Sequence, residues 1–314
     1  MISNGESLEG SQTVHFSPAK PEGPARVKKE ASTDLKLFDL EENTACEEVE
    51  QALGVKFQEK PKFIVLTARN RLALLTRPDL REAIGVSFFE LMRGDIGQFE
   101  AGTAGLYLPE KNLVFLAPEQ ISTPPEISGL SAEDYKKLEH TVAVHETVHA
   151  LTNEINPLIM RYVREEFPNQ ARKFVVAGLL SKVMKVDSSR YEITEAGEEK
   201  YQTYIAFSEA VTYWLSYTIA YSDGAVDAIK SSEFHRRYIK ESKRDEENLH
   251  GEELLHHQNI NTAYEGVHGI LEGLQRAGYS PIKVFLTMIK FPPERLDDLR
   301  HPEQGYVQEL LRHM

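Results

Sequence analysis

The residues with the clearest chemical potential are two histidines and a glutamate in the run His145-Glu146-Thr147-Val148-His149. In a helix of about 3.6 residues per turn, residues i and i+4 lie on one face, so both imidazoles can reach one metal ion. Zinc accepts neutral imidazole nitrogens, and a catalytic zinc site keeps one position for water. Glu146 would stand beside that water and take its proton during attack on a carbonyl. The spacing therefore predicts hydrolysis as well as metal binding.

A helix must position these residues, and the surrounding sequence has the features of one. From Ser131 to Leu151 there is neither glycine nor proline, and the next helix breaker is Pro157. Ser131 is suited to cap the start, with Asp134 three residues later as a variant of the capping box. The alternative is a surface or core helix whose two histidines make ordinary hydrogen bonds and bind no metal.

A catalytic zinc site has three protein ligands and a water molecule, so one protein ligand is needed in addition to the two imidazoles. A histidine six residues after His149 is absent, since Ile155 stands there, and Glu154 lies about 140° around the helix from His149. Glu209 is the better candidate because it lies in the almost wholly apolar and aromatic stretch 204–215. A carboxylate buried there needs a cation or strong donors to offset its desolvation. A hydrogen bond from a tyrosine or arginine of a neighbouring helix is the alternative.

With these residues the chain resembles the gluzincins, metallopeptidases whose zinc is held by a His-Glu-x-x-His helix and a glutamate of a later helix. The residues that carry the resemblance are His145, Glu146, His149 and Glu209. In addition, the stretch 102–116 looks like the hairpin before the active helix in many zincins. The resemblance implies that the edge strand of this hairpin pairs with an extended peptide substrate. The glutamate helix departs from the familiar Asn-Glu-x-x-Ser-Asp and Glu-x-x-x-Asp forms, and Tyr213 stands four residues after Glu209.

The hairpin is also predicted by its own residues. Residues 106–108 and 113–116 are strand-like runs, and Pro109 and Asn112 between them suit a tight turn. Such an edge can bind an extended chain through its backbone groups, although an ordinary edge strand without a partner is equally consistent with the sequence. Residues 62–66 form a further expected strand, and Pro78 opens an expected helix over 77–92.

Helical patterns dominate the rest of the chain. The expected helices lie near 131–155, 157–185, 195–221, 225–245, 253–277 and 281–290. Strands early and helices late predict an α+β fold, with a small mixed sheet and the active-site helix followed by a mainly helical C-terminal half. The resemblance to the gluzincins implies that this fold is zincin-like. The expected organisation is a disordered tail over 1–33, a zincin-like subdomain over 34–155 and a helical subdomain over 156–314. An acidic helix starting near 39–50 and ending near Gly54 should open the folded part.

A donor that stabilises the transition state could come from Tyr264 or His268. These residues are spaced i, i+4, so both can face one cleft. An imidazole or phenol placed there could donate a hydrogen bond to the developing oxyanion. A helix packing position with satisfied polar tips is the alternative, and the more common one.

Composition narrows the function classes. The chain of 314 residues is 41% hydrophobic, enough for a substantial core, and carries a formal net charge of −13. That charge argues against a nucleic-acid binder that works by neutralising phosphates. The single cysteine, Cys46, excludes an internal disulfide, and neither a signal-like amino terminus nor an apolar run of about 18 residues is present. We therefore expect an intracellular, cytoplasmic protein without membrane contact; the oligomeric state is not indicated.

These observations predict a zinc metallopeptidase that acts on peptide or protein substrates. His145, His149 and Glu209 would hold Zn²⁺, Glu146 would be the general base, and His268 or Tyr264 would stabilise the oxyanion. A catalytically inactive zincin-like regulatory or peptide-binding protein is the main alternative. The intact Glu146 argues against it, because a binding module needs no general base. Hydrolysis of a non-peptide amide would use the same residues.

Overall fold

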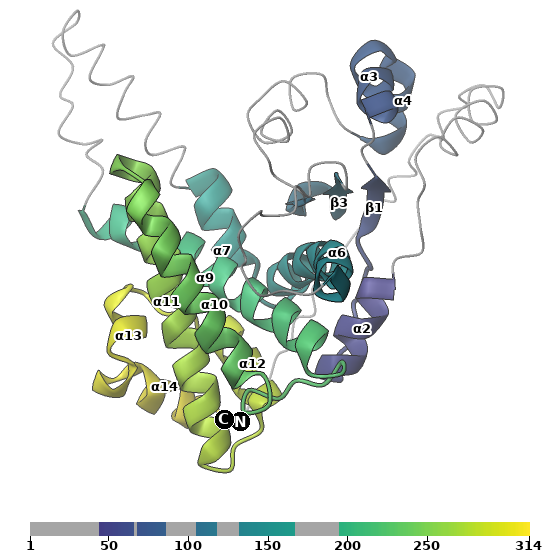
Figure 1. Ribbon diagram of the computed structural model, residues 1–314. Coiled ribbons are helices and arrows are strands. Elements are labelled where there is room, and N and C mark those ends of the chain that lie inside the picture. The colour runs from purple at the N-terminus through teal and green to yellow at the C-terminus, as the bar shows by residue number, and fades with distance from the viewer. Residues whose placement is uncertain (1–43, 66–67, 86–104, 118–131, 167–194) are drawn as a thin grey trace, which may run out of the picture.

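The computed structural model describes residues 44–65, 68–85, 105–117, 132–166 and 195–314. In these ranges the protein is mostly helical with one small mixed sheet, which agrees with the α+β order expected from the sequence (Figure 1). The expected tail over 1–33 lies outside the described residues. So do the later parts of the helices expected over 77–92 and 157–185.

The sheet consists of β1 (Lys62–Val65), β2 (Gly105–Leu108) and β3 (Leu113–Leu116), in the order β1-β3-β2. β1 runs parallel to β3, and β2 runs antiparallel to it. The turn between β2 and β3 is the short helix η3 (Pro109–Lys111), closed by Asn112 in the left-handed conformation at φ 47°. Asparagine tolerates this conformation, which explains why the predicted hairpin forms here.

Helices before and within the sheet region are short. α2 (Thr44–Leu53) ends at Gly54, whose positive φ of 63° stops the helix, as the sequence predicted. α4 (Pro78–Ile84) begins with the expected proline and ends at Gly85 in the left-handed conformation. α3 (Ala68–Thr76), which precedes it, was not predicted because its sequence has no clear apolar stripe.

Two long helices form the centre of the molecule. α6 (Ala132–Ile155) carries the sheet on one side, and α9 (Glu195–Tyr221) packs against α6. α9 is buried along most of its length, with Phe207, Val211 and Trp214 inaccessible to solvent. The extents of both helices agree with those predicted from the sequence.

A short irregular helical segment follows α6. Asn156 ends α6 and caps α7 (Pro157–Arg161), because its side chain accepts a hydrogen bond from the Leu158 N–H at 3.2 Å. α7 continues into the π-helical turn η5 (Tyr162–Glu166), which lies beside α9. The break at Pro157 thus places residues of η5 next to those of α6 and α9.

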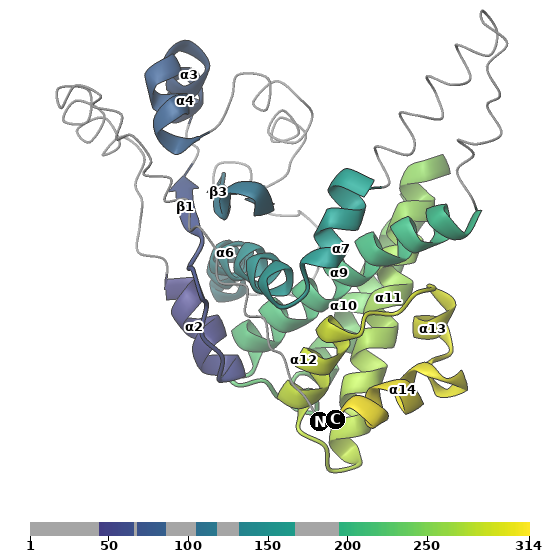
Figure 2. The ribbon, with the colours of Figure 1, turned by 180° about the vertical axis from the view of Figure 1, so that it is seen from behind.

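The C-terminal helices cover the side of α9 away from the sheet, as the two opposite views show (Figures 1 and 2). They are α10 (Ser232–Asp245), α11 (Gly251–Arg276), α12 (Pro281–Lys290), α13 (Asp297–Arg300) and α14 (Tyr306–His313). α11 packs along α9, and Trp214 of α9 stacks on Phe285 of α12. None of the helices in the described ranges combines the length and apolarity needed to cross a lipid bilayer.

The helix expected over 225–245 begins later than predicted. Residues 225–231 form turns, and α10 starts only at Ser232. In these turns the Asp227 carboxylate accepts hydrogen bonds from the backbone N–H groups of Ile229 and Lys230, at 3.1 and 3.0 Å. A side chain that binds nearby backbone donors competes with helix formation, which accounts for the error.

Candidate metal centre

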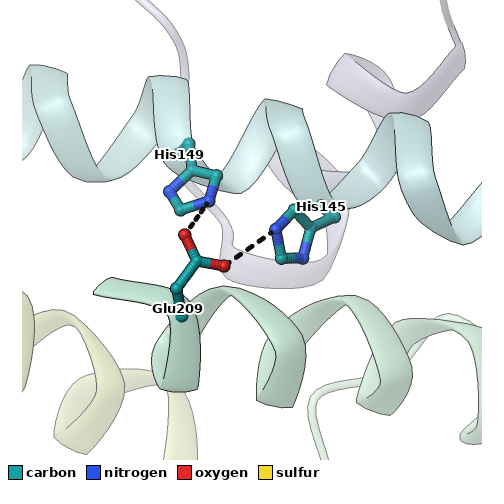
Figure 3. Close-up of side chains that lie close together, drawn as sticks. All are labelled: His145, His149 and Glu209. Atoms are coloured by element: carbon teal, nitrogen blue, oxygen red, sulfur yellow. Dashed lines mark ion pairs between the residues drawn. The ribbon is translucent and has the colours of Figure 1, made fainter. Parts of the chain in front are cut away.

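The three predicted ligands meet between α6 and α9. The Glu209 carboxylate lies between the two imidazoles, with Oε2 at 3.5 Å from His145 Nε2 and Oε1 at 3.4 Å from His149 Nε2 (Figure 3). One ligand atom from each residue can be chosen so that all lie within 4.8 Å of one another. The helical spacing brings the histidines to one face, and packing of α9 on α6 supplies the glutamate.

The separations in this group fit a bound metal ion. Ligands of a tetrahedral zinc ion at about 2.0–2.2 Å stand roughly 3.3–3.5 Å from one another. Each imidazole lies at that spacing from one oxygen of Glu209, at 3.5 Å for His145 and Oε2 and at 3.4 Å for His149 and Oε1. Two imidazoles and one carboxylate also form a donor set that leaves a fourth position open. His145, His149 and Glu209 could therefore hold a metal ion.

The electrostatics of the group favour an ionised Glu209. Burial opposes ionisation, but the charges and hydrogen bonds of His149 and His145 outweigh it and hold the pKa of Glu209 well below its usual range. The carboxylate is thus kept in the charged form that binds cations.

Two hydroxyl groups of α9 orient the ring of His149. Ser208 Oγ and Thr212 Oγ1 lie 3.3 and 3.4 Å from His149 Nδ1. Thr212 donates its own hydrogen to the Ser208 carbonyl at 2.7 Å, so its oxygen is left to accept from Nδ1–H. This arrangement places the proton on Nδ1 and directs the lone pair of Nε2 to the metal position. Ser208 and Thr212 were missed in the sequence, although both are polar residues in the apolar stretch that drew attention to Glu209.

Glu146 lies beside the metal group and away from its ligand atoms. Its side chain is buried, lines the same cavity as the three ligands, and accepts a hydrogen bond from the backbone N–H of Tyr107 in β2. Burial raises the pKa of Glu146, while the neighbouring charges of His145 and His149 act in the opposite direction. A carboxylate with a raised pKa is better matched to accepting a proton near neutral pH.

Gly105 of β2 allows the sheet to approach Glu146. A Cβ atom placed on Gly105 would lie 2.6 Å from Glu146 Oε1 and 2.7 Å from its Cγ. Both distances are too short for real contacts, so a larger residue would have to push the Glu146 side chain aside. The glycine therefore determines where the carboxylate can lie.

The metal group opens into a cavity of about 670 Å³. β2, α6, the π-helical turn and α9 each contribute to its wall. Most of the wall is apolar or aromatic, formed among others by Leu106, Val163, Ile205, Tyr213 and Tyr217. The ring of Tyr213 lies 4.4 Å from that of His145, centroid to centroid. The cavity is large enough for a few side chains of a substrate.

Tyr264 and His268, the expected oxyanion donors, belong to a group of side chains around His235. Neither lines the cavity. Tyr264 is buried behind Tyr238, and its hydroxyl group contacts His235 Nδ1 at 2.6 Å. The ring of His268 packs 5.1 Å from that of His235. Tyr264 matches the packing alternative, because its hydroxyl group has a partner. His268 does not match it fully: its Nε2 lies 3.4 Å from a carboxylate oxygen of Glu272, and neither ring nitrogen has a hydrogen-bond partner within the described ranges. The tyrosines that line the cavity are Tyr107, Tyr213 and Tyr217.

Two other side chains of α6 have partners outside the metal group, and Glu154 is thereby placed where the sequence predicted. His140 Nε2 pairs with Glu48 of α2 at 2.7 Å. Glu154 accepts a hydrogen bond from the Gln58 N–H at 3.1 Å, far along the helix from the ligands. These residues are therefore suitable controls for substitutions at the site.

Comparison of the chain with protein-family models, with curated proteins and with solved structures found no match in any of the three. The functional argument consequently rests on the geometry of the site.

Proposed function

We propose that the protein is a zinc-dependent metallopeptidase with a zincin-like arrangement of gluzincin type. The observation that carries the proposal is a buried carboxylate, Glu146, next to a His145, His149 and Glu209 group in one cavity. Nitrogen and carboxylate donors with an open position suit a catalytic zinc ion. The raised pKa of Glu146 and the mainly apolar wall suit hydrolysis of a bound peptide.

Each residue of the group has a distinct task in this mechanism. When bound, zinc would polarise the scissile carbonyl and lower the pKa of an attacking water molecule from its bulk value to about 7. Glu146 takes the proton from the water and delivers it to the departing amine. Ser208 and Thr212 keep His149 in the tautomer that can bind the ion. The Tyr107 N–H holds the Glu146 carboxylate in place.

Removal of the metal tests the proposal. We expect the protein to cleave a mixed peptide pool after loading with zinc, and to lose this cleavage on dialysis against a chelator. Readdition of zinc should restore it, because the ligands are side chains of the folded protein. Mass spectrometry of the products measures the effect and identifies the bonds that are cut. Cleavage that persists in metal-free protein, or a zinc-loaded protein that cleaves no peptide, would contradict the proposal.

A second prediction concerns the glycine that faces Glu146. Gly105→Ala should reduce kcat/KM by roughly tenfold or more, because displacement of a catalytic group by about 1 Å can be that costly. Zinc content should not change, since the atoms nearest to the added methyl group belong to Glu146 and Val142, which are not ligands. Steady-state kinetics and metal analysis on the same preparation measure both quantities.

Gly269→Ala in α11 is the matched control, because a Cβ atom there meets nothing within 4 Å. It should retain full activity. Wild-type kinetics for Gly105→Ala would show that the close approach of β2 does not position Glu146.

A further inference from the structure

Arg164 is the single lysine or arginine among the described residues that line the cavity. It lies in the π-helical turn after α7, on the wall that faces β2. Its Nη2 donates a hydrogen bond to the Tyr107 carbonyl at 2.8 Å. This bond fixes one end of the guanidinium at the edge of the sheet, beside the residue whose N–H holds Glu146.

No carboxylate of the described ranges forms an ion pair with Arg164. The neighbouring Arg161 differs, since it pairs with Glu166 at 3.3 Å. A guanidinium has five N–H donors in a planar fork, and the bond to Tyr107 uses only one of its nitrogens. The remaining donors can bind a carboxylate in bidentate fashion.

The charge balance of the cavity also favours an anion. Its two carboxylates are Glu146 and Glu209. The two positive charges of a bound zinc ion would balance these two negative charges. The guanidinium of Arg164 would then give the cavity a net charge of plus one. In a mostly apolar cavity such a charge is costly to leave without a partner.

We propose that Arg164 binds a carboxylate of the substrate, so that the site selects peptides with a negative group close to the cleaved bond. This inference rests on the proposed peptidase function and adds the substrate class. The carboxylate can belong to an acidic side chain or to the carboxyl terminus of the peptide.

Binding of labelled peptides to zinc-loaded Glu146→Gln protein tests this without turnover. Three peptides share one apolar sequence: one is neutral with an amidated carboxyl terminus, one has a free carboxyl terminus, and one is amidated with an internal glutamate. We expect at least one of the two carboxylate peptides to bind roughly 10- to 100-fold more tightly than the neutral peptide in fluorescence anisotropy. The tighter of the two identifies the source of the carboxylate.

Variants at position 164 assign the preference to the guanidinium. Arg164→Gln should reduce the preference to about twofold or less, while Arg164→Lys, which keeps the charge but not the fork, should retain part of it. Arg161→Gln is the matched control from the same segment and should keep the full preference. Circular dichroism verifies folding, and the lysine variant decides the matter if the glutamine variant does not fold.

Three results would overturn the inference. One is equal or undetectable binding of all three peptides to the parent protein. Another is a preference that persists in Arg164→Gln, which would place the carboxylate on the metal. A third is a preference lost in Arg161→Gln as strongly as in Arg164→Gln. Failure of the unmodified enzyme to cleave any peptide, together with an intact carboxylate preference, would contradict only the peptidase assignment.

Discussion

Zinc-loaded Glu146→Gln protein is expected to contain the same amount of zinc as the wild-type protein and to hydrolyse peptides roughly 100- to 10,000-fold more slowly. Glutamine has nearly the shape of glutamate, and its carbonyl oxygen can still accept the Tyr107 N–H. It cannot take a proton from water near neutral pH. The substitution therefore removes the base and leaves the ligands in place. Metal analysis and product quantification on one preparation measure both properties.

Glu154→Gln is the matched control for this experiment. It lies on the same helix, and its carboxylate binds the Gln58 N–H outside the cavity. Its turnover should equal that of the wild-type protein. Peptide cleavage at the wild-type rate by Glu146→Gln would exclude Glu146 as the general base, and zinc loss in the same variant would show that its role is structural.

Substitution of Glu209 by alanine should weaken zinc binding by more than roughly 100-fold. Loss of a residue that only hydrogen-bonds to a metal ligand typically weakens binding by roughly 10- to 100-fold, and Glu209 is itself a proposed ligand. Glu209 supplies the only carboxylate in the three-residue metal group of the described chain. Without it, the two imidazoles face a cavity with no negative charge between them. Equilibrium dialysis against buffered zinc, followed by metal analysis, gives the affinity directly.

Thermal unfolding gives an independent readout of the same substitution. A ligand at about 100 times its Kd stabilises a folded protein by about 2.7 kcal/mol, so zinc should raise the Tm of the wild-type protein. The same zinc concentration should have little effect on Glu209→Ala. Glu199→Ala is the control on α9, because that carboxylate pairs with Arg295 at 3.1 Å on the surface. Equal zinc affinities for wild type and Glu209→Ala would require a different third ligand.

The local part of the site was predictable from the sequence because it depends on helical periodicity. The His-Glu-x-x-His spacing placed both imidazoles on one face of α6, and the structure has them there. Glu209 was found by a different argument, the cost of burying a carboxylate in an apolar helix. The burial cost does not indicate which side chains the carboxylate faces. Its position beside the two histidines depends on the packing of α9 against α6, which the sequence does not show.

The residues that were missed belong to contacts between segments far apart in the chain. Arg164 reaches Tyr107, and Gly105 meets Glu146, through packing of the π-helical turn and β2 on the active helix. No pattern within either segment indicates these partners. The surroundings of Tyr264 and His268 were unpredictable for the same reason, because helical spacing identifies their common face but not the buried His235 that faces it.

The fold was predicted best where local signals agree with the tertiary structure. The proline and asparagine of the hairpin turn and the glycine after α2 mark real boundaries. The parallel pairing of β1 with β3 was not predictable, since it joins residues far apart in the chain, such as Lys62 and Leu113. α13 and α14 were also missed, because four- and eight-residue helices give little periodicity.

The central claim is that His145, His149 and Glu209 together bind one zinc ion. Anomalous diffraction at the zinc absorption edge, from crystals of the zinc-loaded protein, tests this directly. We expect a single strong peak between α6 and α9, at about 2.0–2.2 Å from Nε2 of each histidine and from the Glu209 carboxylate. A peak bound by other side chains, or no peak between these helices at saturating zinc, would contradict it.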